Sequence, residues 1–155
     1  MGQVMDAKDT VAANLAECFI TIEGKRYNFM QLYKFESKME INTSEIPILG
    51  KTGKGNKATG WTGTWSGTAH YNQSIIREML YKYKKTGSLP SIEIQVTNED
   101  PTSSVGRQTV ILKGCIIKGG ILAKFDADSE YLDEDIEGTF DDWELAERFS
   151  LLQGM

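Results

Sequence analysis

The sequence contains few of the residues from which catalytic and metal sites are built. Its 155 residues include 2 cysteines and 1 histidine. Cys18 and Cys115 stand alone, without a CxxC pair or a His/Cys cluster, so we expect buried free thiols and neither a metal site nor a redox centre. His70 has no nucleophile elbow, metal-ligand spacing or neighbouring acid in the sequence, which predicts a solvated strand histidine. These absences argue against an enzyme and against a bound cofactor.

Long hydrophobic runs are also missing. No apolar stretch approaches the roughly 20 residues of a membrane helix. The first residues contain acids and no signal-peptide core. We therefore expect no membrane segment and a protein made and kept in the cytosol. The length fits a single domain, which we expect to span residues 1–155.

Positive charge is scarce only near the C-terminus. Residues 1–125 hold 16 Lys and Arg against 11 Asp and Glu, whereas residues 126–155 hold 1 against 11. Blocks of one sign usually form a solvated face or tail. In a protein that binds copies of itself, they also serve as complementary patches that set orientation and register. The sequence alone leaves both interpretations open.

The triplet Gly50-Lys51-Thr52 resembles the end of a phosphate-binding loop. That motif needs a glycine five positions before its Gly-Lys pair, and Glu45 stands there. A strand pattern follows, so the helix whose N-terminus should face the phosphate is missing. The acids at 133–135 lack the ligand pattern of a calcium loop and are interpreted as a solvated face. Both motifs are therefore rejected as binding sites.

Strands dominate the secondary-structure pattern, with one long helical segment. A hairpin is predicted around the turn Glu23-Gly24. Further strands are predicted over residues 33–43, 61–71, 92–96, 109–118 and 139–143. A helix is predicted from Ile75, capped by Asn72 or Ser74 and ended by Gly87. The fold class predicted is mainly β, a β-sandwich or partly open barrel, with one central α-helix.

Three stretches lie outside these predicted elements. Residues 1–16 are expected to form an N-terminal arm, and residues 44–60 an extended flexible loop. Residues 144–155 are expected to form a C-terminal tail, either as a short helix or as a docked segment.

Two long strands alternate between an apolar and a polar face. The apolar residues expected in the monomer core include Tyr33, Phe35, Met39, Trp61 and Trp65. The polar residues are Lys34, Glu36, Lys38, Glu40, Thr62, Thr64, Ser66 and Thr68. Open edges of such strands invite pairing with another copy, and head-to-tail contacts can close a ring around an axis. The polar rows would then line a hollow, or lumen.

A second interpretation is a monomeric small β-barrel that binds single-stranded nucleic acid or a small ligand. Trp61, Trp65 and Tyr71 would supply a stacking platform, with Lys51, Lys54 and Lys57 nearby. The formal net charge of −5 argues against it, because such proteins bind through a basic groove.

From about residue 17 to about residue 149, the chain resembles the tail-tube proteins of contractile phage tails, defective prophages and phage-tail-like (R-type) bacteriocins of Gram-positive bacteria. The resemblance rests on pieces in a matching order: the hairpin at Glu23, the stretch "EIPILGKTGKGNKATGWTGTWSGTAHY", the helix "SIIREMLYKYKKTG", the strand "SIEIQVTNED" and the ending "LDEDIEGTFDDWELAERF". Where the family tends to have prolines near and after its final strand, this chain has Glu137 and Ala146. Residues 144–152 are therefore expected to be more helical than in relatives.

The resemblance implies a homo-oligomer of hexameric rings, stacked into a hollow tube inside a contractile sheath, without catalytic residues. Sheath, tape-measure and baseplate proteins would be its partners. DNA would be non-specific transiting cargo in a phage, whereas a bacteriocin tube would pierce a target envelope. Assembly would take place in the bacterial cytoplasm, before the tube becomes part of a particle tail. The residues implied to contact the adjacent ring are Lys51, Gly53, Lys54, Gly55, Lys57 and Gly60.

Overall fold

The protein folds into a bent β-sheet with one α-helix, which confirms the predicted fold class. The computed structural model describes residues 7–9, 11, 16–28, 32–72 and 74–150. In chain order the elements are a 3-10 turn Ala7–Asp9, β1 Ala16–Ile22, β2 Lys25–Asn28, β3 Leu32–Pro47, β4 Lys54–His70, α1 Ile75–Thr86, β5 Ile92–Glu99, β6 Arg107–Gly119, β7 Asp133–Phe140 and β8 Asp142–Glu147. The predicted hairpin at Glu23-Gly24 joins β1 to β2.

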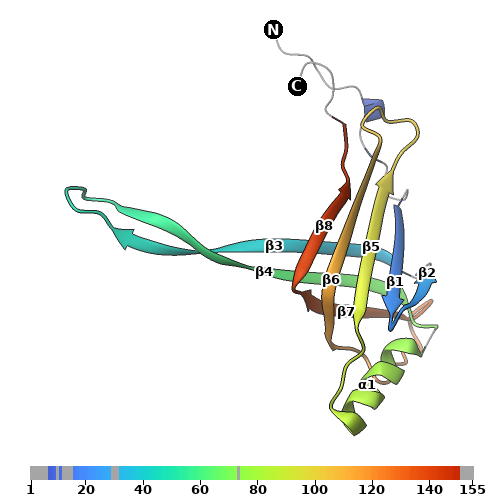
Figure 1. Cartoon of the computed structure of the whole chain (residues 1–155). Coiled ribbons are helices and arrows are strands. Elements are labelled where there is room, and N and C mark those ends of the chain that lie inside the picture. The colour runs from blue at the N-terminus through green and yellow to red at the C-terminus, as the bar shows by residue number, and fades with distance from the viewer. Residues whose placement is uncertain (1–6, 10, 12–15, 29–31, 73, 151–155) are drawn as a thin grey trace.

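The long strand β6 joins two layers of this sheet. The strand order is β2-β1-β5-β6-β7-β4-β3, with β8 also pairing with β6. The first part of β6 pairs with β5 and β8, whereas its last residues pair with β7. Gly114, which lies two residues before the pairing with β7 begins, has a φ of 63°, which suits glycine and lets the strand bend. The β1-β5-β6-β8 layer therefore crosses the β3-β4-β7 layer (Figure 1).

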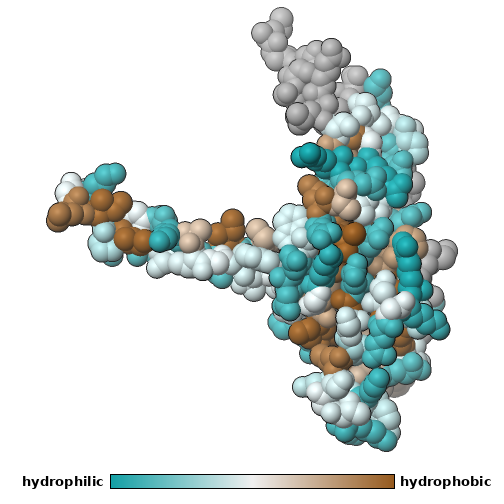
Figure 2. Space-filling model, viewed as in Figure 1, coloured by the Kyte–Doolittle hydropathy of each residue, from teal (hydrophilic) through white to brown (hydrophobic). Residues whose placement is uncertain are grey.

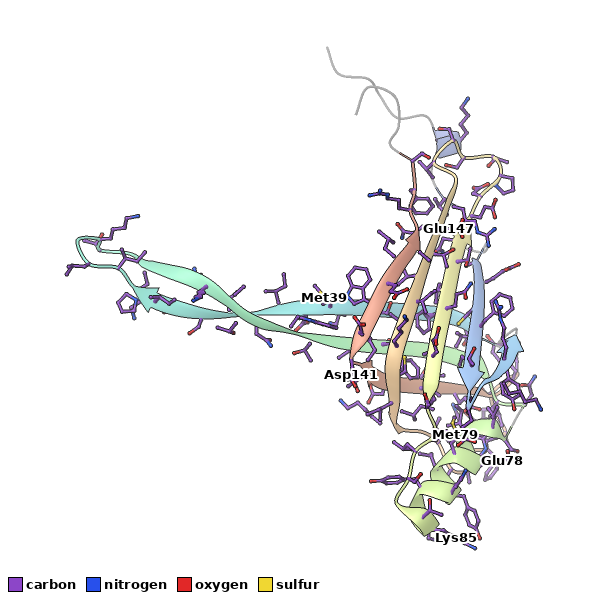
Figure 3. All side chains as sticks on the ribbon, viewed as in Figure 1. Met39, Glu78, Met79, Lys85, Asp141 and Glu147 are labelled. Carbon is purple, nitrogen blue, oxygen red and sulfur yellow. The ribbon has the colours of Figure 1, made fainter. Side chains whose placement is uncertain are left out.

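The hydrophobic core lies between the two layers and under α1. Its fully buried side chains include Ile76 of α1, Ile94 of β5 and Leu112 of β6. Phe35 is half-buried and stacks on Trp65, with ring centroids 6.2 Å apart. In Figure 3, Met79 points from α1 toward the sheet, and Lys85 lies at the far end of the helix. Helix α1 thus closes one end of the core.

Helix α1 is attached to β7 through a buried ion pair. The Arg77 guanidinium lies 3.2 Å from the Glu134 carboxylate, whose side chain is fully buried. Arg77 also donates a hydrogen bond to the carbonyl of Ile121 at 3.1 Å and lies over the ring of Tyr71. The helix ends at Gly87, as predicted, in the left-handed conformation that glycine favours.

The prediction of a flexible loop over residues 44–60 is wrong. Strand β3 continues to Pro47 and β4 begins at Lys54, so only residues 48–53 form the connecting turn. The two strands pair in register from Thr43–Ala58 to Pro47–Lys54. In this stretch the backbone N–H and C=O groups of the two strands pair with one another. Such pairing does not depend on hydrophobic side chains, so a glycine- and lysine-rich sequence can form it.

Of the two alternatives left open for the C-terminal tail, the short helix is not formed over residues 142–147, which form β8. This strand pairs with β6, and Lys113 and Glu144 form an ion pair at 2.7 Å. The final strand predicted over 139–143 is two strands, separated at Asp141, whose N–H donates to the carbonyl of Lys113. Residues 151–155 and most of the predicted N-terminal arm lie outside the described residues.

Three residues assigned to the core from sequence are exposed. Tyr33, Met39 and Trp61 keep accessible surfaces, whereas Trp65 is buried. Tyr33 stands at a register shift of β3, where its ring lies against His70 and its hydroxyl donates to Asp133, so it lies outside the core. For Met39 and Trp61 the reason is that β3 and β4 extend past the opposite layer, as Figure 1 shows, so this layer covers them only in part. At that margin Trp143 Nε1 of β8 donates to Met39 Sδ at 3.3 Å, and the Trp61 and Phe140 ring centroids lie 6.0 Å apart.

Candidate functional site: a polar sheet face and a projecting hairpin arm

The eight polar residues predicted to line a lumen lie together on one face of the β3–β4 ribbon. They form four directly opposed pairs: Lys34–Thr68, Glu36–Ser66, Lys38–Thr64 and Glu40–Thr62. Residues two apart in a strand share a face, so the four pairs form two parallel rows. Their grouping was predicted from sequence.

Strand β7 and the end of β6 widen this polar face. Thr68, Ser66 and Thr64 of β4 pair with Asp135, Glu137 and Thr139 of β7. Two adjoining shallow hollows on the face also include Lys118 of β6 among their lining residues. These residues were not among the predicted lumen residues, and the acids at 133–135 were interpreted as a solvated face. The alternation of Asp135, Glu137 and Thr139 with Ile136, Gly138 and Phe140 is the signal that would have found them.

The polar face carries mixed charge. Its ionisable residues are Lys34, Lys38, Lys118, Glu36, Glu40, Asp135 and Glu137, three lysines and four carboxylates. Lys38 and Glu40 form an exposed ion pair at 3.4 Å, and Thr68 donates a hydrogen bond to Asp135 at 2.9 Å. Small hydroxyl side chains occupy the rest of the β4 row. Such a face presents no continuous positive charge to a polyanion.

The back of this face is closely packed. Trp65, Ile136 and Phe140 are buried there. A Cβ added to Gly63 would lie 2.5 Å from the Phe140 ring. The polar rows therefore stand on a sheet whose other side is filled.

A hairpin arm, residues 43–59, projects far from the body of the protein (Figure 1). Its turn includes Leu49, which is fully exposed, and the nearby Ile46 and Ile48 are also exposed. Figure 2 shows this hydrophobic patch at the end of the arm. Exposed lysines accompany it, with Lys54 lying 3.9 Å from Glu45. The arm thus ends in an apolar and basic tip.

The six residues predicted to contact an adjacent ring all lie on this arm or at its base. Lys51 and Gly53 are in the turn, and Lys54, Gly55 and Lys57 follow in β4. Gly60 lies at the irregularity where the β3–β4 register shifts, next to Asn42. Gly50-Lys51-Thr52 connects two strands, so no helix follows it.

His70 has an acidic neighbour that the sequence analysis missed. Its Nδ1 lies 3.6 Å from Asp133 Oδ1, and Tyr33 donates its hydroxyl to Asp133 Oδ2 at 2.7 Å. That hydrogen bond raises the pKa of Tyr33 to about 12. His70 pairs with Asp133 across β4 and β7, which lie far apart in sequence, so no local motif signals the contact. The His70 side chain is exposed, as predicted.

The two cysteines are free, as predicted. Burial raises the pKa of each thiol, Cys18 and Cys115, to about 12. No group of three or more His, Cys, Asp or Glu side chains in the described part of the chain is placed to hold a metal ion. Among those same residues, no helix has the length and apolarity needed to cross a bilayer.

The stacking platform of the nucleic-acid interpretation is not formed. Trp65 points into the core and its Nε1 donates to the carbonyl of Thr139, so its ring is not available to a base. Tyr71 lies under the Arg77 guanidinium. Of the three aromatic residues, Trp61 alone is exposed.

Comparisons with known proteins agree with this geometry. The chain is 30% identical over 146 residues to the phage-like element PBSX protein XkdM of Bacillus subtilis (strain 168), covering 94% of this chain and 97% of that protein. It is 29% identical over 144 residues to the protein YqbM of the same organism, covering 93% and 95%.

Solved structures share the fold. A chain of the 6-fold symmetrised anti-feeding prophage baseplate matches with a TM-score of 0.68 at 11% identity, covering 87% of this chain and 94% of that one. A chain of the sheath-tube complex of the extracellular contractile injection system PVC, in its extended state, matches with a TM-score of 0.61 at 9% identity, covering 90% and 95%. The family model described as "Phage tail tube protein" matches residues 3–147. The chain therefore belongs to the phage tail tube protein family.

Proposed function

We propose that this tail tube protein is a structural subunit that assembles into hexameric rings, and that the rings stack into a hollow tube inside a contractile sheath. The observation that carries this proposal is the continuous polar face of β3, β4 and β7, which lies on a sheet with open edges. The 6-fold symmetry of the anti-feeding prophage baseplate, which contains a chain of the same fold, supports the ring number.

The open edges supply the means of ring closure. Within the described residues, β3 pairs only with β4, and β2 pairs only with β1. An unpaired strand edge presents free N–H and C=O groups that another copy can satisfy. Head-to-tail pairing that returns to its start forms a closed ring and leaves no edge exposed.

The polar face would then line the lumen. A DNA conduit must not retain its cargo, and every lysine that neutralises a phosphate adds affinity. Three lysines balanced by four carboxylates on this face suit transit of DNA in a phage. The same lining suits a water-filled tube that pierces an envelope in a bacteriocin. We propose assembly in the bacterial cytoplasm, followed by a place in the particle's tail.

The remaining partners follow from the tube's position. The PVC match is a chain of a sheath-tube complex, and the anti-feeding prophage match is a chain of a baseplate. We propose sheath, baseplate and tape-measure proteins as the partners of this chain. The arm residues Lys51, Gly53, Lys54, Gly55, Lys57 and Gly60 would lie at the junction between stacked rings.

Electron microscopy of the purified chain tests the proposal. Negative-stain images at high protein concentration should show hollow rings or tubes, and six-fold symmetry should appear in end-on class averages. Sedimentation at several concentrations should show a monomer that converts to large assemblies without a stable dimer. A chain that stays monomeric in both measurements would overturn the proposal.

A further inference from the structure

We propose that the tip of the hairpin arm binds the segment formed by residues 121–131 of a second copy of this chain, here called the acceptor segment. This inference rests on the proposed tube and names the surface that the arm contacts. In this contact, Ile48 and Leu49 lie against Leu122 and Phe125, and the lysines of the tip face the carboxylates of the acceptor segment.

The apolar tip of the arm requires a partner outside its own chain. Leu49 is fully exposed, and Ile46 and Ile48 add to the same patch. The arm holds them away from the body, as Figure 2 shows. Burial of apolar surface contributes about 25 cal/mol per Å², so docking this patch would be favourable.

After Leu49, the most exposed large hydrophobic side chains among the described residues lie in the acceptor segment. Leu122 is 71% exposed and Phe125 is 87% exposed. The segment has no strand or helix, yet it is anchored by hydrogen bonds at Ile121 and Lys124, and at its far end the Tyr131 ring lies against His70. Arg77 donates to the carbonyl of Ile121, and Lys124 donates to the carbonyl of Asp133 at 2.8 Å. Phe125 is therefore presented by an anchored surface.

A tight turn adds order to the middle of the acceptor segment. The N–H of Asp128 donates to the Asp126 side chain at 3.0 Å, and the N–H of Ser129 donates to the Asp126 carbonyl at 3.3 Å. This turn fixes the acidic side chains beside Phe125. A pre-ordered surface loses less entropy on binding than a mobile one.

The charges of the two surfaces are opposite. The arm carries the exposed Lys51, Lys54 and Lys57, with one acid, Glu45. The acceptor segment carries the exposed Asp126, Asp128 and Glu130, and its single lysine is the one that binds the Asp133 carbonyl. Opposite charges around apolar contacts favour this pairing over other encounters between copies. In this contact, acidic residues that follow residue 125 would face the basic tip of another copy.

The two surfaces lie at opposite ends of the same layer. Strand β4 starts at Lys54 beside the tip and ends at His70, and His70 pairs with Asp133, which closely follows the acceptor segment. At about 3.3 Å per residue, the 17 residues of β4 span roughly 55 Å. The tip of one copy therefore reaches the acceptor segment of the next copy in a head-to-tail manner. Contacts of this kind propagate and do not end at a dimer.

Disulfide cross-linking tests the contact in the full-length chain. The double variant Leu49→Cys with Phe125→Cys should give a ladder of cross-linked oligomers when tubes are oxidised, whereas Leu49→Cys with Tyr81→Cys should not. Tyr81 is an exposed aromatic residue of α1 and serves as a matched control. Tubes that contain the first pair and yield no ladder would overturn the contact.

A charge exchange supplies an independent test. The variant with Lys51→Glu, Lys54→Glu and Lys57→Glu should lose tubes, and so should the variant with Asp126→Lys, Asp128→Lys and Glu130→Lys. The chain that carries all six changes should recover them. Failure of the combined variant to form tubes, with circular dichroism showing a folded chain, would overturn the contact.

The same experiments separate this inference from the proposed function. If the unmodified chain forms no tubes, the proposed function is wrong, and the proposed contact is wrong with it. If tubes form and the cross-link or the charge exchange fails, the tube remains and the contact alone is wrong.

Discussion

Trp65 and Gly138 are opposed residues of β4 and β7, and the glycine leaves the space that the indole ring occupies. A Cβ built on Gly138 would lie 2.8 Å from the Trp65 ring and would also overlap the carbonyl oxygen of Ile116. The indole is held in place by a hydrogen bond from Nε1 to the Thr139 carbonyl at 3.2 Å. The polar face is therefore supported from behind by a contact that allows no side chain at residue 138.

Gly138→Ala should destabilise the fold. The added methyl group must displace a buried ring or a strand carbonyl, and overpacking of this kind costs about 1–3 kcal/mol. Gly119→Ala is the control, because nothing lies within 4 Å of a Cβ built there. Guanidinium unfolding measures both. Equal free energies of unfolding for the two variants would contradict this interpretation of the Trp65–Gly138 contact.

Arg77→Leu should weaken the attachment of α1 to the sheet. It leaves the buried Glu134 carboxylate without its cation, and loss of one partner of a buried pair costs about 3–5 kcal/mol. The control is Lys82→Leu, which removes an exposed pair with Glu23 and should cost about 1 kcal/mol or less. Both free energies come from denaturant titration. A smaller loss for Arg77→Leu than for Lys82→Leu would refute the structural role of the pair.

Ser66→Cys should report whether the polar face lines the lumen. In the monomer, Ser66 is exposed and a cysteine there should react with a bulky PEG-maleimide. In an assembled tube the same thiol should be protected from the bulky reagent but still react with a small maleimide. Lys85→Cys, at the far end of α1, should stay reactive in both states. Equal protection of both positions in the tube would argue against a lumen on the polar face.

Alkaline pH should destabilise the folded chain. Burial raises the pKa of Cys18 and Cys115 from 9.0 to about 12, so the unfolded chain loses its thiol protons first. The contribution of each thiol to stability is complete below about pH 9 and is lost as the pH rises toward 12. Unfolding titrations on either side of pH 9 measure the loss, and Cys18→Ala should reduce it. Rapid alkylation of both thiols in the native protein at pH 8 would contradict their burial.

Alternation along the chain was sufficient to predict the two faces of β3 and β4. Lys34, Glu36 and their neighbours share a face because residues two apart always do in a strand, whatever the fold around them. The end of the helix could also be predicted from a local signal, since Gly87 ends it through its own backbone conformation. The extent of the core could not be predicted from local patterns, because it depends on how far the opposite layer reaches. Met39 and Trp61 stay partly exposed because the opposite layer covers them only at its margin, where Trp143 of β8 contacts Met39.

Elements that depend on distant partners could not be predicted in the same way. Strand β8 forms along β6, about thirty residues upstream, where Lys113 and Arg107 meet Glu144 and Glu147. The arm is a ribbon because two strands pair over its glycine-rich sequence, and its composition alone resembles a loop. Asp133 reaches His70 only when β7 pairs with β4. To predict each of these features, one must know the order of the strands in the sheet, and no local sequence pattern gives that order.

The arm depends on the body for very little. The polar contacts described for residues 43–59 join them to one another or to Asn42, at the arm's base. Folding of the two-layered body can therefore proceed without regard to the sequence at the tip. A tip from another relative could be grafted between Asn42 and Gly60, and such a chimera would change which neighbour it recognises while the rest of the subunit folds as before.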